Sequence, residues 1–255
     1  GAAIATFIVL MSSCSFSLLF LFSKKVHVLI SFGNYSRKLM LNILYLGMSP
    51  FLILATDSIL LIVMNTVLQK YGGPEQGDML ITCATIVQSY MLLITSPMIG
   101  ISGGTQAIIS YNYGAGNKER VKDTMKRMIL VCLAGTLLLA GVAILAPQIY
   151  TGLFTNNQEL LKLTCQVMPV YFLGISIFGI QCACQTSFIS LGQAKVSLFI
   201  ALLRKIILMI PLAIILQKFM GVMGIYRAEP IADVISVVTT SVVFIDTMKK
   251  VLRNM

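Results

Sequence analysis

The sequence predicts an all-α polytopic membrane protein, and three observations carry that prediction. Hydrophobic residues make up 57% of the 255 residues, and the mean hydropathy is +0.91. Charged residues make up only 11%, whereas soluble domains typically carry about 25%. The apolar residues also fall in runs of roughly 20, the length that a helix needs to cross a bilayer. One soluble core cannot hold this much apolar surface, so lipid is expected to cover part of it.

Seven apolar runs are long enough to be membrane helices. Their expected bounds are 2–22, 40–69, 79–111, 125–146, 166–190, 196–217 and 224–245. Proline and glycine inside such runs are expected to bend or break a helix, because proline removes a backbone donor and glycine is flexible. The expected bending or hinge positions are Pro50, Pro97, Gly100, Gly103, Gly104 and Pro211.

The connections between these runs predict the orientation in the membrane. With alternating sides, 15 of the 19 basic residues fall on one side: Lys24, Lys25, Arg37, Lys38, Lys118, Arg120, Lys122, Lys126, Arg127, Lys195, Arg204, Lys205, Lys249, Lys250 and Arg253. Because basic loops stay in the cytoplasm, that side and the C-terminus are predicted to be cytoplasmic, in the plasma membrane. The net charge of +10 then reflects topology, and no nucleic-acid partner is predicted.

Acidic side chains within the runs are candidate functional groups. Asp57 lies near the middle of 40–69, where a carboxylate costs about 2.5–3.5 kcal/mol to insert and by default marks function. Two interpretations remain open: a site that binds and releases a cation, or a protonated carboxyl hydrogen-bonded to a neighbouring helix. No basic partner is evident at that depth. Glu229 and Asp233 are expected to pair with Arg227 or to be solvated at the outer membrane surface.

Polar side chains recur at helical spacing on two of the runs. Thr85, Gln88 and Ser89 lie in 79–111, and Ser176, Gln181 and Gln185 lie in 166–190. These six residues are candidates for lining a hydrated substrate cavity. Hydrogen bonds between helices are the alternative explanation.

The glycine-rich run at 96–117, SPMIGISGGTQAIISYNYGAGN, is not a nucleotide-binding loop. It lacks the Gly-Lys-Ser/Thr ending that contacts phosphate and magnesium. The chain has no H-E-x-x-H, G-x-S-x-G or paired-cysteine metal motif, and its six cysteines lie in or beside apolar runs. We therefore expect free cysteines, no metal site, no cofactor and no enzymatic activity. His27 is expected to be solvated.

Four stretches of the chain resemble the multidrug and toxic compound extrusion (MATE) family. They are GISGGTQAIISYNYGAGNKERVK, GAAIAT at the start of 2–22, SLGQAK at the end of 166–190, and GIYRAEPIADVIS at the start of 224–245. The resemblance implies an antiporter of twelve helices in two lobes, which exports cationic and amphipathic compounds in exchange for protons or sodium ions. Residues 1–22 would then be the last helix of the first lobe, 23–38 a cytoplasmic linker, 39–248 the second lobe and 249–255 a basic tail. The rest of the first lobe would be missing, so the chain is expected to be a fragment.

The resemblance also places Asp57 where some family members hold the coupling cation. Those members use a second carboxylate on the helix matching 166–190, and this chain has only Ser176, Gln181 and Gln185 there. The alternatives are a flippase for lipid-linked precursors and a seven-helix receptor. A flippase would need basic residues facing the cavity to hold pyrophosphate, and the runs 40–69, 79–111 and 166–190 have none in their spans.

Overall fold

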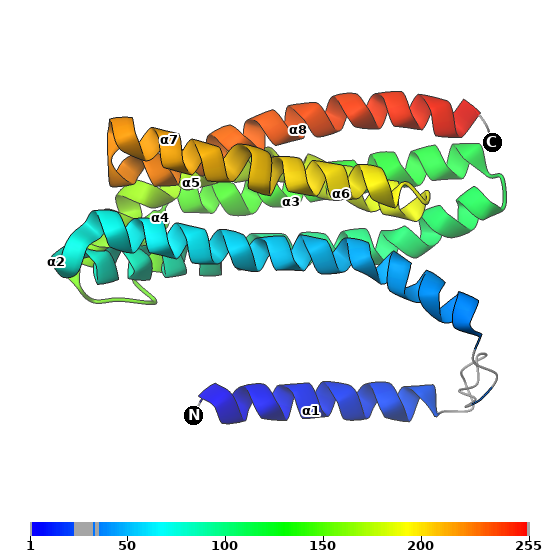
Figure 1. Ribbon diagram of the computed structural model, residues 1–255, viewed down its shortest axis with the longest axis horizontal. Helices are drawn as coiled ribbons and strands as arrows, with labels where there is room; N and C mark the ends of the chain where they lie inside the picture. Colours follow the sequence, from blue (N-terminus) through cyan, green and yellow to red (C-terminus); the bar gives the residue numbers. More distant parts are fainter. Residues whose placement is uncertain (1, 23–32, 34–35, 254–255) are drawn as a thin grey trace. The chain divides into compact units, whose positions relative to one another are not determined.

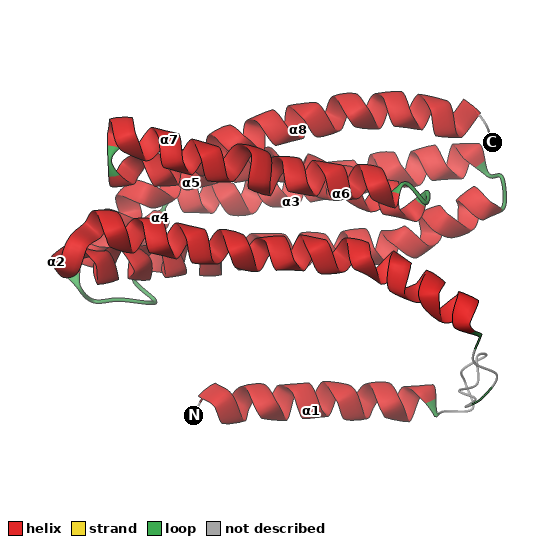
Figure 2. Ribbon diagram, in the orientation of Figure 1, coloured by secondary structure: helices red, strands yellow, loops and turns green. Residues whose placement is uncertain are grey.

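The computed structural model describes residues 2–22, 33 and 36–253, and the regular structure in this part of the chain is helical throughout (Figure 1, Figure 2). The all-α prediction is confirmed. The helices are α1 (Ala2–Leu21), α2 (Arg37–Gly114), α3 (Lys118–Leu145), α4 (Pro147–Thr151), α5 (Gln158–Ser190), α6 (Ala194–Leu202), the π-helical segment η1 (Leu203–Met209), α7 (Ile210–Met220) and α8 (Val222–Arg253). His27 and most of the predicted linker at 23–38 lie outside the described residues.

The chain divides into two compact units, residues 1–46 and 47–255. In the first unit, α1 is a single helix of 20 residues that is apolar on every side. Its residues Ile4–Leu21 have a mean hydropathy of 2.2 and none of them is buried, which suits a helix surrounded by lipid or by other membrane helices.

Several helices of the described chain can cross a membrane by length and composition. Five segments pass: Ile4–Leu21, Gln76–Gly114, Lys118–Leu145, Ala194–Met220 and Met223–Arg253. The two straight parts of α5 form a sixth span if the bent helix is taken as one. The predicted run 40–69 is helical too, as the first arm of α2, but it is not among the segments that pass.

Helix α2 contains two of the predicted runs, and it folds back on itself between them (Figure 1). The turn lies at Gly73, whose backbone is non-helical at φ 65° and ψ −169°, a region that glycine enters without steric cost. The two arms are in close contact next to it, where a Cβ on Gly72 would lie 2.7 Å from the Cα of Gly77. The second arm continues as helix through Pro97, Gly100, Gly103 and Gly104. A hinge at those four residues, and at Pro50 in the first arm, stays a prediction.

Helix α5 packs between α3 and α8, and glycines bring the backbones together. A Cβ on Gly179 would lie 2.4 Å from the backbone oxygen of Cys132 in α3, and one on Gly174 would lie 2.6 Å from the Cα of Pro230 in α8. Between these two contacts α5 bends by 42°, between Ile175 and Phe178. Side chains that reach into the backbone ladder commonly accompany such bends, and the hydroxyl of Thr136 lies 3.0 Å from the oxygen of Ser176.

The predicted run 196–217 is one span made of three segments, α6, η1 and α7. The π-helical turn ends just before Pro211. Proline cannot donate to the carbonyl one turn earlier and its ring crowds that carbonyl, and the wider π-helical turn gives the ring room. A bend or hinge at Pro211 itself stays a prediction.

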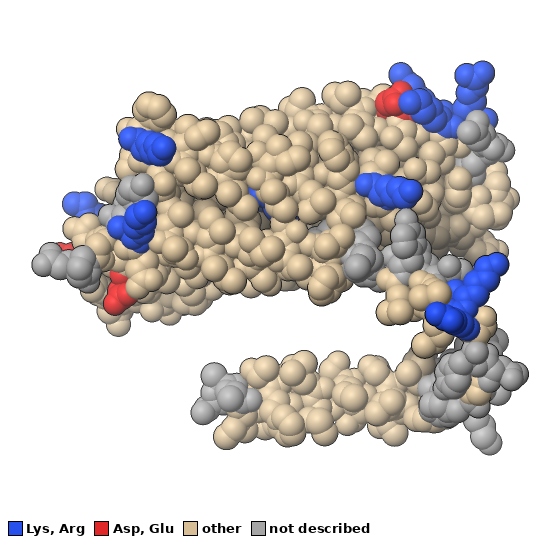
Figure 3. Space-filling view, viewed as in Figure 1, with Lys and Arg blue, Asp and Glu red and all other residues tan. Residues whose placement is uncertain are grey.

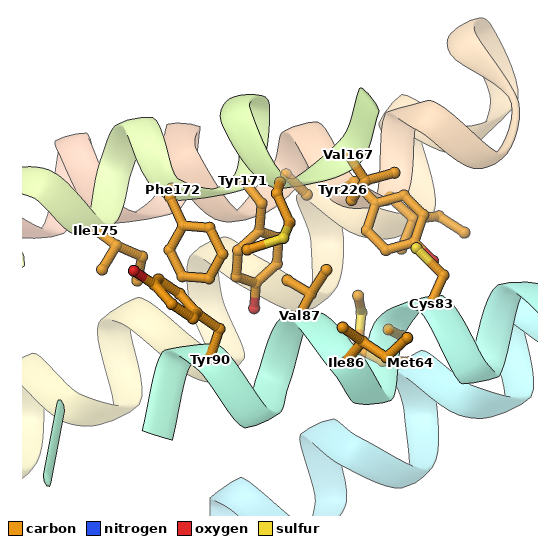
Figure 4. Packing of buried hydrophobic residues seen from close by; sticks show 14 of the residues in the cluster. Met64, Cys83, Ile86, Val87, Tyr90, Val167, Tyr171, Phe172, Ile175 and Tyr226 are labelled. Carbon is orange, nitrogen blue, oxygen red and sulfur yellow. The ribbon is translucent and has the colours of Figure 1, made fainter. Parts of the chain in front are cut away.

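The interior of residues 47–255 has two hydrophobic clusters. The first joins α2, the end of α3, α5, η1, α7 and α8 and contains the edge-to-face pair Tyr90–Phe172, with ring centroids 5.2 Å apart (Figure 4). Tyr226 of α8 adds a hydrogen bond from its hydroxyl to the oxygen of Leu80, at 3.0 Å. The second cluster joins the second arm of α2, the first half of α3, the end of α5, α6 and the end of α8. The level of the bundle between the two clusters contains buried polar side chains.

Candidate functional site

Two carboxylates and one guanidinium meet in the interior of the second unit. Arg204 of η1 donates from Nε to Asp233 Oδ1 at 2.6 Å and from a terminal nitrogen to Glu229 Oε1 at 2.7 Å. Glu229 and Asp233 lie four residues apart on α8, so they share one face of that helix. The side chains of Arg204, Glu229 and Asp233 are 8%, 7% and 0% exposed. These charges are therefore shielded from both water and lipid.

The next residue of η1 makes a second ion pair in another direction. Lys205 Nζ pairs with Asp57 Oδ1 on the first arm of α2. The Lys205 side chain is 13% exposed and that of Asp57 is 49% exposed. Asp57, Arg204, Lys205, Glu229 and Asp233 thus form one charged cluster, which joins α2, η1 and α8.

The charged cluster corrects three predictions made from the sequence. Arg204 and Lys205 do not belong to a cytoplasmic loop, since they lie inside the span Ala194–Met220. Glu229 and Asp233 pair with Arg204 and not with Arg227, which is exposed and contacts Met220 Sδ at 3.6 Å. Asp57 does have a basic partner, Lys205.

The physical reason for these errors is that the partners lie on different helices. The span Ala194–Met220 has a mean hydropathy of 2.5 in its most apolar window, so two bases do not prevent it from being helical and buried once acids neutralise them. A signal was present in the sequence, because Arg and Lys within an apolar run mark function by the same rule that singled out Asp57.

The predicted cavity residues of α2 lie on a part of the helix surface that is open in this chain. Thr85 is exposed, and Gln88 and Ser89 are half-buried. The hydroxyls of Thr85 and Ser89 both donate to α2 itself, to the oxygens of Ile81 and Thr85 at 2.8 Å. These residues therefore remain accessible to a ligand or to another helix.

The predicted cavity residues of α5 lie inside the bundle. Gln181 is 1% exposed, and its Oε1 has no hydrogen-bond partner in the described chain. Gln185 is half-buried and donates to the oxygen of Ser197 at 3.4 Å, while Ser176 donates to the oxygen of Phe172 at 3.0 Å. The structure thus places three candidates on an open face of α2 and three in the interior of the bundle, and their role in substrate binding stays a prediction.

Charged side chains are otherwise confined to the ends of the second unit. Figure 3 shows Lys and Arg gathered toward the two ends of the bundle, and its middle on this face is almost entirely without charge. Within the charged cluster, Arg204, Glu229 and Asp233 are buried and Asp57 is half exposed. A polytopic helical membrane protein with paired charges inside one lobe is the class that this fold and site define.

Comparison with known proteins gives the family. The MatE family profile matches residues 54–215, which is more than half of the chain. The chain belongs to the MatE family. This match includes most of α2, the whole of α3 to η1, and Asp57, Arg204 and Lys205.

Relatives agree with this assignment. The chain is 25% identical over 240 residues to the multidrug export protein MepA of Staphylococcus haemolyticus, a match that covers 92% of this chain and 51% of that protein. A solved MATE transporter of the MOP superfamily is 19% identical with a TM-score of 0.87 in an outward-facing conformation, over 98% of this chain and 56% of that one. An inward-facing conformation matches at 18% identity and a TM-score of 0.78, over 99% and 58%. The chain thus spans about half the length of the relatives it matches.

Proposed function

We propose that this chain is the second lobe, with one additional helix, of a two-lobe antiporter that exports cationic or amphipathic compounds. Family membership favours transport over enzymatic activity as the function of this chain. The name of the Staphylococcus haemolyticus relative supports export of several compounds. Two matched structures, one outward-facing and one inward-facing, support alternating access.

The observation that carries the coupling mechanism is the ion pair between Asp57 and Lys205 within a membrane-spanning bundle. A carboxylate held by an ammonium group is already a cation site, with the lysine as its occupant. A proton or a sodium ion that binds Asp57 competes with Lys205 and releases it. Lys205 then moves toward Glu229, the carboxylate that the neighbouring Arg204 of η1 holds.

The replacement of Lys205 by a proton or sodium ion at Asp57 can change the free-energy difference between two conformations of the transporter, which is what coupling requires. A ligand shifts a conformational equilibrium only if it binds the two states with different affinity. Asp57 is half exposed and Lys205 nearly buried, so cation binding at Asp57 changes the charge on the open surface of the lobe. The substrate would bind against this surface, near Thr85, Gln88 and Ser89, and between the two lobes.

The flippase alternative would need a free cationic group for pyrophosphate. The span Ala194–Met220 does contain two basic residues, Arg204 and Lys205, but three carboxylates pair with them. Because these bases are already neutralised, a cationic or amphipathic substrate fits this interior better than a pyrophosphate.

We further propose which end of the bundle faces the cytoplasm. It is the end that contains Arg253 and the loops at 115–117 and 191–193, since most of the remaining basic loop residues lie there.

Efflux of a fluorescent cationic dye from cells that make the complete transporter tests this function. The Asp57→Asn variant is expected to lose efflux while still reaching the membrane, because it can no longer exchange a cation. Collapsing the sodium and proton gradients separately in the parent protein then identifies the ion.

The matched control is Asp246→Asn, which removes an exposed carboxylate paired with Lys250 on the surface of α8. It is expected to export dye normally. Unchanged efflux in Asp57→Asn would show that coupling does not use this carboxylate.

A further inference from the structure

The middle of the second unit is a polar layer, formed by Gln181, Ser197, Arg204, Asp233, Ser236 and Thr240. All six residues are at most 7% exposed. On α5 the buried apolar residues of the first cluster end at Ile175 and those of the second begin at Ala183. The polar layer therefore separates two hydrophobic clusters, and lies at the level where α5 bends and η1 is π-helical.

Most oxygen atoms of the polar layer have no protein partner. Gln181 Oε1, Ser197 Oγ, Asp233 Oδ2, Ser236 Oγ and Thr240 Oγ1 are buried without a hydrogen bond in the described chain. Leaving a buried polar group unsatisfied costs about 1–3 kcal/mol, and native cores usually satisfy such groups. All five atoms are oxygens. Hard cations prefer oxygen ligands, and water can donate hydrogen bonds to them.

The packing contacts put these oxygens on facing helix surfaces. Gly174 lies against Asp233, and further along the same two helices the rings of Phe188 and Phe244 are 5.7 Å apart. These contacts show that α5 and α8 run in the same direction. Gln181 lies midway between Gly174 and Phe188, so it is level with the stretch of α8 that contains Ser236 and Thr240.

The third helix meets the same level from the other side. Arg204 reaches Asp233, and Ser197 comes two turns before Arg204 on a helix that runs against α8. Ser197 is therefore level with Thr240, which comes two turns after Asp233. Gln185 of α5 confirms this placement by donating to the oxygen of Ser197.

The charges around the layer do not balance. Two buried carboxylates, Glu229 and Asp233, share one guanidinium, that of Arg204. Lys205 is already paired with the half-exposed Asp57, so one negative charge is left in the buried group when all five side chains are ionised. A buried charge without compensation is strongly unfavourable. The other titratable group against the cluster is the phenol of Tyr171 on α5, which supplies no positive charge.

The missing positive charge has a defined place. Asp233 Oδ2 is buried without a partner, and it lies beside Gly174, where a Cβ would come within 3.0 Å of it. Ser236 is one turn away on the same face of α8. We propose that the polar layer binds one monovalent cation, a proton or a sodium ion, at Asp233 Oδ2, with the hydroxyl of Ser236 and water as its other contacts. This site is separate from Asp57, and it concerns binding at equilibrium.

The test uses the complete protein in lipid nanodiscs and three variants. Asp233→Asn keeps the hydrogen bond from Arg204 and removes the charge. Ser236→Ala removes one proposed contact. Ser241→Ala is the matched control, because Ser241 is on the same helix and its hydroxyl already donates to the oxygen of Val237 at 2.8 Å.

Two measurements distinguish the two cations. If sodium binds, replacing choline chloride by sodium chloride at constant ionic strength raises the unfolding temperature of the parent protein and of Ser241→Ala by the same amount. It raises that of Asp233→Asn by less, and any rise that remains comes from the site at Asp57. Ser236→Ala then needs about tenfold more sodium for the same rise, as expected for the loss of one contact. If a proton binds, sodium has no effect, and the infrared spectrum shows a protonated carboxylic acid that is absent from Asp233→Asn and shifted in Ser236→Ala.

Either pattern supports the site. A parent protein that shows neither signal, or an Asp233→Asn variant whose sodium response and infrared spectrum equal those of the parent, overturns it. If Asp233→Asn does not fold, Ser236→Ala decides, since a response identical to that of Ser241→Ala also overturns the proposal. A transporter that loses dye efflux in Asp57→Asn, but whose two signals do not change in Asp233→Asn, would refute this site and leave the proposed function intact.

Discussion

At the residue scale, the interactions of Arg204 dominate the interior of this lobe. It makes two short hydrogen bonds to carboxylates, and its guanidinium lies 4.6 Å from the ring centroid of Phe178. Arg is well suited to this position because its planar group binds carboxylates and stacks on aromatic rings at the same time. Loss of either kind of partner leaves buried charge behind.

Arg204→Met is therefore expected to destabilise the protein by about 3–5 kcal/mol, because Glu229 and Asp233 lose their donor while they remain buried. Denaturant unfolding in detergent micelles measures this change. The matched control Arg227→Met removes an exposed guanidinium and should stay within about 0.5 kcal/mol of the parent.

The triple variant Arg204→Met, Glu229→Gln, Asp233→Asn should recover much of the lost stability, since no buried charge is left. If Arg204→Met alone has the stability of the parent protein, the ion pairs are not structural.

Single residues also show where sequence reasoning stops. Asp57 was identifiable as a candidate site because a carboxylate in an apolar run is costly. Its partner Lys205 was not, because the pairing joins segments that are far apart in the chain and come together only through packing. The unpartnered oxygens of Ser197, Ser236 and Thr240 were invisible for the same reason, since serine and threonine are ordinary residues of membrane helices.

At the element scale, a glycine sets the distance between α3 and α5, because it has no side chain to hold the two backbones apart. Gly179 permits α5 to approach α3 until backbone touches backbone. The apolar runs predicted α3 and α5 to within a few turns. They did not predict this contact, because several glycines in the chain, including Gly141, have open space around them.

Gly179→Ala is expected to destabilise the protein by about 1–3 kcal/mol, because the new methyl group would force α3 and α5 apart. The control is Gly141→Ala on α3, where a Cβ has no neighbour within 4 Å. That change should be neutral or stabilising by up to about 1 kcal/mol, because alanine favours the helix.

The unfolding temperatures of the two variants, measured side by side in one detergent, give the comparison. Equal values would mean that the α3–α5 contact relaxes without cost.

At the scale of the whole molecule, the described helices leave a large apolar surface exposed. Residues Ile4–Leu21 of α1 are unburied, and large exposed apolar side chains continue along α2, α3 and α8. Lipid covers part of such a surface. The matched structures are longer, with this chain covering 56–58% of them, and their remaining helices would cover another part.

The chain made alone is accordingly expected to reach the membrane and to export no dye, because the proposed substrate site lies between two lobes. Dye efflux from cells that make residues 1–255 measures this, with the complete transporter as the positive control. Export by residues 1–255 alone would place the entire pathway inside one lobe, and would refute the proposed arrangement.

The π-helical segment η1 has a consequence for comparing this chain with others. A π-helical turn takes up more residues than an α-helical one, and each residue of a regular helix turns the next by about 100°. A relative whose corresponding span is α-helical throughout would thus match this one only with a one-residue gap near 203–209. Without that gap, Arg204 and Lys205 would be aligned with residues on the wrong face, and two bases that define the lobe interior would be counted as substitutions.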